Sequence, residues 1–144
     1  MASANFRNVA LAIASAAINF GTDTFKALLV TSFPNETALD TWVDRADVTG
    51  EHDASGGYAA GGFAITVDSV TLNTTDNRLE IEFLAPDPTY EDVTLAGVVG
   101  CIIYKSTGTA ANDLLVAAVD FGSAKGVTGG NFRVTFATPL LINV

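Results

Sequence analysis

Residues 63–67, Phe-Ala-Ile-Thr-Val, and residues 79–83, Leu-Glu-Ile-Glu-Phe, decide the fold, because in both runs every second side chain is apolar. A period of two places successive side chains on opposite faces of an extended strand. The first run continues into residues 70–72, Val-Thr-Leu, and a turn-rich segment at residues 73–77 follows. The pattern predicts neighbouring strands of a β-sheet, with the carboxylates of Glu80 and Glu82 on one face.

More strands are predicted on both sides of this pair. The best candidates are residues 24–31, 94–104, 114–121, 131–136 and 139–143. Gly, Asn, Asp and Pro separate them, and the glycine-rich residues 122–130 are predicted to form a turn. About seven short strands with such spacers are typical of an antiparallel β-sandwich or barrel. We therefore expect an all-β domain with one short helix.

The short helix is expected at residues 36–44. Pro34 ends the preceding strand, and Asn35 is a residue type that caps helix N-termini. Leu39, Trp42 and Val43 then share one helical face. The single tryptophan is expected to anchor the core or an interface.

The first 20 residues are apolar and rich in alanine, and we treat them as an N-terminal arm attached to a single domain at residues 21–144. Helical spacing relates Phe6, Val9 and Ile13, although the same residues could instead pair in an extended arm. The apolar side chains of this arm are expected to pack either on the arm's own domain or on a neighbouring subunit. The run 9–18 resembles a signal-peptide core, but one Arg is a weak basic region, so we expect it to be retained.

Composition limits the function. The chain has 144 residues, 49% of them hydrophobic, and a formal charge of −9. This hydrophobic content argues against a disordered chain, and the charge argues against nucleic-acid binding, which depends on clustered Lys and Arg. Residues 36–53 and 76–92 each carry six acids and one base. We expect these two acidic windows to face solvent and the nearly uncharged ends to make contacts.

Few residues suit catalysis or metal binding. Cys101 and His52 are single examples of their types, so neither an internal disulfide nor a zinc site is expected. The acids at 44–53 lack the spacing of a calcium loop, and Glu80 and Glu82 are expected to form a solvated strand face. No apolar run is long enough to span a bilayer. We therefore predict no catalytic residues, cofactor, metal or membrane partner.

Two stretches resemble a known family. They are residues 45–51, Arg-Ala-Asp-Val-Thr-Gly-Glu, with 57–62, Gly-Tyr-Ala-Ala-Gly-Gly, and residues 103–108 with 114–122, which end in Asp-Phe-Gly. Together with residues 25–32, they are similar to small virion structural proteins of tailed bacteriophages. The resemblance covers roughly residues 24–143. We expect Tyr58 to lay its ring on the core, and Asp120 to accept hydrogen bonds from a turn at a strand end.

The resemblance implies a non-enzymatic role in the particle, most simply a capsid decoration (cement) protein that stabilises the major capsid shell. The implied partners are the major capsid protein and further copies of the chain, with a trimer favoured. The protein would be made in the host cytoplasm and lie on the capsid surface. A tail or head–tail connector subunit and a receptor- or glycan-binding fibre module are the alternatives. The predicted interface residues are Phe6, Val9, Leu11, Ile13, Ile18, Trp42 and Tyr58.

Overall fold

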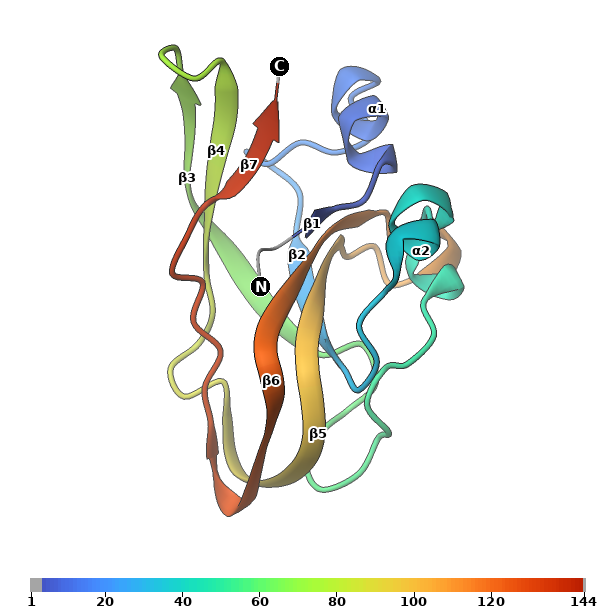
Figure 1. The fold of residues 1–144 in the computed structure, drawn as a ribbon, viewed down its shortest axis with the longest axis vertical. Coiled ribbons are helices and arrows are strands. Elements are labelled where there is room, and N and C mark those ends of the chain that lie inside the picture. The colour runs from blue at the N-terminus through green and yellow to red at the C-terminus, as the bar shows by residue number, and fades with distance from the viewer. Residues whose placement is uncertain (1–3, 144) are drawn as a thin grey trace.

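A computed structural model describes residues 4–143. Within this range, seven antiparallel strands form one sheet in the order β1-β6-β5-β2-β3-β4-β7. The sheet curls into a nearly closed barrel, so that the edge strands β1 (Ala4–Asn5) and β7 (Leu140–Asn143) approach each other (Figure 1). The all-β prediction, an antiparallel sandwich or barrel with about seven strands, is confirmed.

The centre of the sheet is β2 (Phe25–Val30), which lies between β3 and β5. Phe25 and four of the next five residues are buried, because this part of the sheet is covered on both faces. One cover is the barrel interior, and the other is a second apolar cluster beside the helices. This double burial explains why the strand's alternation fades toward its end.

The hairpin of β3 (Phe63–Asn73) and β4 (Arg78–Leu84) projects at one end of the barrel (Figure 1). A register shift between Val67 and Ser69 inserts one extra residue into β3. Without this bulge, Val70 and Leu72 would point away from the face that carries Ile65. The two predicted runs, 63–67 and 70–72, are therefore one strand with a bulge.

The longest pair is β5 (Tyr90–Lys105) and β6 (Leu115–Phe132). The predicted turn at 122–130 and the predicted strand at 131–136 are both wrong, because β6 continues to Phe132 and residues 133–139 are not a strand. The glycines of residues 122–130 instead lie where the pairing register between β5 and β6 shifts. A Cβ on Gly126, for example, would lie 2.7 Å from the Leu95 carbonyl oxygen.

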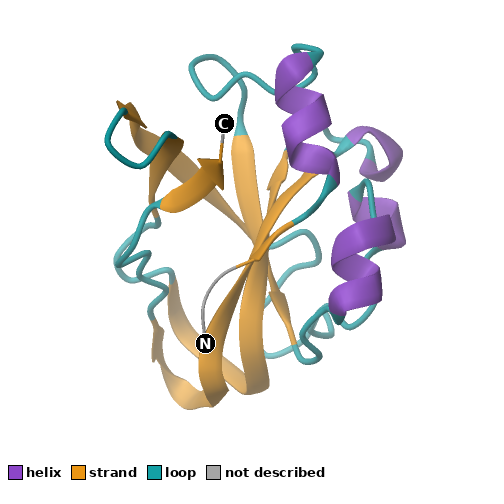
Figure 2. Cartoon of the chain, turned by 45° about the horizontal axis from the view of Figure 1, so that its top comes forward, coloured by secondary structure: helices purple, strands orange, loops and turns teal. Residues whose placement is uncertain are grey.

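Within residues 4–143, two short α-helices lie on one side of the barrel (Figure 2). Helix α1 is Asn8–Ala14, and helix α2 is Glu36–Thr41. The predicted cap is confirmed, because Asn35 Oδ1 accepts from the Ala38 N–H at 2.9 Å. The predicted helix was too long, since Trp42 leaves the helical conformation and the 3₁₀ turn η1 (Arg45–Asp47) follows. A second 3₁₀ turn, η2 (Ala110–Asn112), joins β5 to β6.

Residues 4–20, the described part of the N-terminal segment, pack on their own chain. Strand β1 pairs with β6, the fully buried Phe6 lies in the cluster beside α2, and Val9, Ala12 and Ile18 join the barrel interior. Lys105 Nζ also donates to the Ala17 carbonyl oxygen at 2.8 Å and lies 3.2 Å from Asp23. We expected the apolar segment to be covered either by its own domain or by a neighbouring subunit. For these residues, the structure shows that their own domain covers them.

Candidate functional site

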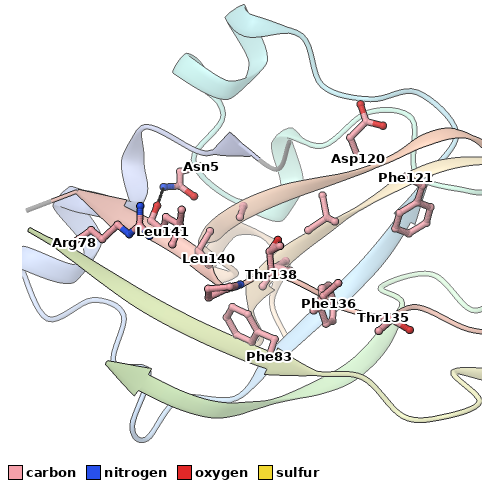
Figure 3. Close-up of a pocket in the computed structure, with 15 residues that line it drawn as sticks. Asn5, Arg78, Phe83, Asp120, Phe121, Thr135, Phe136, Thr138, Leu140 and Leu141 are labelled. Atoms are coloured by element: carbon pink, nitrogen blue, oxygen red, sulfur yellow. Dashed lines mark hydrogen bonds between the residues drawn. The ribbon is translucent and has the colours of Figure 1, made fainter. Parts of the chain in front are cut away.

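A cavity lies at the seam where the two edges of the sheet meet. The Asn5 side-chain amide donates to the Leu141 carbonyl oxygen at 2.7 Å and bridges β1 to β7. Beneath this bridge a cavity of about 790 Å³ opens between β6 and residues 133–141 (Figure 3). We call it the seam cavity. Its size falls within the range of about 300–1,000 Å³ that is typical of ligand sites.

The floor of the seam cavity is apolar. Phe83 on β4 and Ile103 on β5 are both almost fully buried. Phe121 and Phe136 are half-buried at the sides, and the Phe83 and Phe136 rings meet edge to face with centroids 6.3 Å apart (Figure 3). These surfaces suit an apolar group.

The charged side chains at the rim are already engaged within the chain. Arg78 Nε donates to Glu80 at 3.0 Å and its Nη2 lies 3.4 Å from Asp76. A hydrogen bond from Asn73, together with that from Arg78, lowers the pKa of the Glu80 carboxyl. Asp120 Oδ1 accepts from the Gly122 N–H at 2.6 Å. The seam cavity is therefore suited to binding apolar groups rather than to proton transfer.

A second, smaller cavity of about 360 Å³ lies beside α2, lined by residues 32–35, by one side of the helix through Trp42, and by Thr49. We call it the helix groove. Trp42 is held from one side, because its ring stacks on Phe6 with centroids 6.4 Å apart. Unlike the seam cavity, this groove is lined largely by hydroxyl and aromatic side chains.

The glycine-flanked Tyr58 is buried, as its sequence context predicts. Its hydroxyl accepts from the Leu29 N–H at 3.1 Å and donates to Glu51 Oε1 at 2.8 Å. The same Glu51 oxygen accepts from the Gly61 N–H at 2.6 Å. Burial, together with the neighbouring Glu51 carboxylate, raises the pKa of Tyr58 well above its usual value. This network fixes the 50–62 loop onto β2.

The other two tyrosines of the chain surround this network. Tyr104 donates to the Gly61 carbonyl oxygen at 2.5 Å. The Tyr90 ring packs edge to face on Tyr58, and its buried hydroxyl has no hydrogen-bond partner in the described part of the chain. Burial raises the pKa of both Tyr90 and Tyr104 to about 12. All three tyrosines therefore stay protonated at neutral pH. Tyr58 and Tyr104 act through packing and hydrogen bonding, and Tyr90 acts through packing.

Arg45 and Asp113 form an ion pair next to the tyrosines. Arg45 Nε lies 2.8 Å from Asp113 Oδ2, and the Asp113 side chain is 1% exposed. Burial opposes ionisation of Asp113, but hydrogen bonds from Thr107 and Arg45 outweigh it and hold the pKa of this carboxyl below its ordinary value. The pair joins η1 to the segment after η2.

The acids at 44–53 serve local structure. Asp44 and Asp47 cap η1 from both directions, and Glu51 belongs to the Tyr58 network. The Nδ1–H of buried His52 donates to the Asp53 carbonyl oxygen at 2.7 Å. Among residues 4–143, no three His, Cys, Asp or Glu side chains gather in a way that could hold a metal ion.

The remaining candidate residues lie apart. Cys101 is fully buried on β5, and burial raises the pKa of its thiol to about 12. Glu80 and Glu82 sit on one face of β4, where Glu82 accepts from Ser69 Oγ at 3.3 Å. None of the described helices is long and apolar enough to cross a membrane.

The seven predicted interface residues have different surroundings. Phe6, Val9, Ile18 and Tyr58 are at most 3% exposed within their own chain, so this conformation does not present them to a partner. Trp42 and Ile13 are half-buried, whereas Leu11 on α1 is 68% exposed. The structure brings Phe6 and Trp42 together but leaves Tyr58 in a different cluster.

Sequence reasoning missed the seam cavity, because Asn5 and Leu141 are 136 residues apart and no local pattern links them. The Asp120-Phe121-Gly122 stretch was the one available signal, since Asp120 and Phe121 both line the cavity. Asp120 does accept from the backbone at Gly122, although inside β6 rather than at its end.

Comparisons with family models, with curated proteins and with solved structures found no match to this chain. The resemblance to phage virion proteins therefore depends on the sequence stretches alone.

Proposed function

We propose that this chain is a non-enzymatic virion structural protein of a tailed bacteriophage that decorates the capsid and binds the major capsid protein. The observation that carries the proposal is an uncovered apolar face on the β3–β4 hairpin. Val70 pairs with the fully buried Ile81, and Leu72 pairs with Leu79, so both point to the core face of the sheet. They are nevertheless 50% and 56% exposed.

The hairpin separates apolar from acidic side chains. Glu82 pairs with Ser69 and Glu80 pairs with Thr71, which places both carboxylates on the face opposite Val70 and Leu72. One face of the hairpin is therefore solvated, while the other continues the core beyond the point where the barrel covers it. Exposed apolar surface next to polar surface favours a protein contact. We call Val70 and Leu72 the hairpin patch and propose it as the capsid contact.

This proposal changes the role of the N-terminal segment. Its buried residues support the barrel, so a deletion of residues 2–18 would remove core side chains as well as any contact. Loss of capsid binding after that deletion would not separate the two effects. Substitutions in the hairpin patch avoid this problem, because both side chains are already half exposed.

The test measures how much protein co-sediments with particles that lack it. We expect the wild-type chain to bind shells saturably, and a Val70→Ser, Leu72→Ser variant to bind at least about tenfold more weakly, since two apolar contacts are lost. Thr71→Ser on the opposite face is the matched control and should bind like wild type. Urea unfolding verifies that each variant is folded.

Two results would contradict the proposal. Binding to tails or connectors rather than shells would replace decoration with the alternative of a tail or head–tail subunit. Wild-type binding by the Val70→Ser, Leu72→Ser variant would remove the hairpin patch as the contact. Sedimentation equilibrium of the free protein tests the trimer that the family resemblance favours.

A further inference from the structure

The helix groove has a lining that the capsid proposal does not use. It combines the aromatic rings of Phe33 and Trp42 with hydroxyl groups from Ser32, Thr37 and Thr49. The groove follows the end of β2 and runs beside α2. Helix α2 lies on the same side of the barrel as α1 (Figure 2). The lining of the groove shares no residue with the hairpin patch, Val70 and Leu72.

The groove is held in shape by contacts behind it. The Trp42 ring stacks on the fully buried Phe6, and a Cβ on Gly100 would lie 3.1 Å from Phe33 Cδ2, which shows how closely Phe33 packs on β5. Pro34 is buried and Asn35 caps the helix. Both aromatic side chains are thus positioned by the core before any ligand arrives, which lowers the entropic cost of binding.

The hydroxyl groups remain available. Thr41 donates to the Thr37 carbonyl oxygen at 2.7 Å and so is committed to the helix. Within the described part of the chain, the hydroxyls of Ser32, Thr37 and Thr49 and the indole N–H of Trp42 make no hydrogen bond. These groups can donate to a bound molecule, and the hydroxyls can also accept.

The lining also determines the charge of the ligand. Among the described residues, no ionisable side chain lines the groove, and part of its lining belongs to the acidic window 36–53, which also contains Glu36 and Asp40. An anion would find no cation here and would meet a negative field, so phosphates and acidic sugars are disfavoured. A metal ion would find no carboxylate in the lining. The ligand that fits is uncharged.

From these four observations we infer that the helix groove binds a neutral saccharide. A pyranose ring has an apolar face of C–H groups and an edge of hydroxyls, which match an aromatic surface flanked by hydroxyl side chains. A volume of about 360 Å³ lies at the small end of ligand sites, so one or two sugar rings fit better than an extended peptide. The saccharide contacts a different surface from the capsid, so either binding can be absent without the other.

The single tryptophan makes the test specific. Because Trp42 is the only tryptophan of the chain, its fluorescence reports on this groove. The full-length protein is titrated with methyl glycosides of glucose, galactose, mannose and N-acetylglucosamine. We expect a saturable change with at least one of them, with a dissociation constant of about 1 mM or tighter. Methyl glucuronide or galacturonide, which carries a carboxylate in place of the neutral group, should bind at least about tenfold more weakly.

Variants locate the binding. Thr37→Val and Thr49→Val keep the side-chain shape but remove a hydroxyl, and each should weaken binding about fivefold. Thr66→Val, on the exposed face of β3, is the matched control and should bind like wild type. The inference is overturned if no neutral glycoside gives a saturable change, if the acidic sugar binds as well as its neutral counterpart, or if both threonine variants bind like wild type.

Discussion

The side chain of Asn5 donates a hydrogen bond to the Leu141 carbonyl oxygen at 2.7 Å, and this contact joins the two free edges of a seven-stranded sheet within the described residues. Strand β1 is two residues long, so little else in it ties the edges together. The seam cavity lies directly beneath. The barrel is therefore closed by a side chain where a complete barrel would be closed by a strand pair.

Asn5→Ala should weaken this closure. We expect a loss of about 1 kcal/mol in the free energy of unfolding, because one hydrogen bond is removed at a partly exposed position. Hydrogen exchange at the Phe6 amide, which donates to the Val116 carbonyl oxygen at 3.1 Å, should become faster. Asn131→Ala on the exposed end of β6 is the control. Equal exchange in both variants would show that the seam does not depend on Asn5.

Two tyrosines provide a matched pair. Tyr58→Phe leaves the buried Leu29 N–H without its side-chain partner, and we expect a loss of about 2 kcal/mol in urea unfolding. Tyr90→Phe removes a hydroxyl that has no partner in the described residues, so its effect should be within about 0.5 kcal/mol of zero or stabilising. A larger loss for Tyr90→Phe than for Tyr58→Phe would contradict the hydrogen-bond assignment.

The glycine pair after Tyr58 is expected to be a structural requirement. A Cβ on Gly62 would lie 1.9 Å from the Ala27 carbonyl oxygen, and its φ is +76°. Gly62→Ala should cost more than about 3 kcal/mol, through steric overlap as well as backbone strain. Gly97 has a similar φ of +68° but open space around it, so Gly97→Ala should cost about 1 kcal/mol. Thermal unfolding of the two variants separates overlap from strain.

The buried Asp113 predicts how stability depends on pH. Its pKa is lower in the folded protein than in the unfolded chain, where it is near 3.9. Its ionised form therefore stabilises the fold above that value, and the contribution is lost as the pH falls through the folded pKa. Asp113→Asn should be less stable at neutral pH and should lose less stability on acidification. Asp87→Asn, which breaks an exposed ion pair with Arg133, should change little at neutral pH.

The strands that could be predicted are those with a clear local pattern. Alternation at 79–83 and the predicted strand at 24–31 correspond to β4 and β2, and the Asn35 cap follows from residue type. The end of β6 could not be predicted, because Gly122, Gly126 and Gly129 normally indicate a turn. In this structure the segment continues β6 through register shifts against β5, and Gly126 approaches β5 closely, which only the partner strand reveals.

The sites were harder to predict than the strands. The seam cavity joins residues from both ends of the chain, and the helix groove brings Thr49 next to α2 through the path of the intervening loop. The hairpin patch needed the bulge after Val67, since simple alternation from Ile65 would place Val70 on the other face. Trp42 was a predicted anchor, and its stacking on Phe6 agrees with the core alternative.

A cryo-EM map of the intact particle tests the central claim most directly. The account predicts barrel-shaped density on the outer surface of the capsid shell, with the β3–β4 hairpin against a major capsid subunit and the acidic windows facing solvent. Density for this chain in the tail or connector, or on the shell with Glu80 and Glu82 in the contact and Val70 and Leu72 facing solvent, would contradict it.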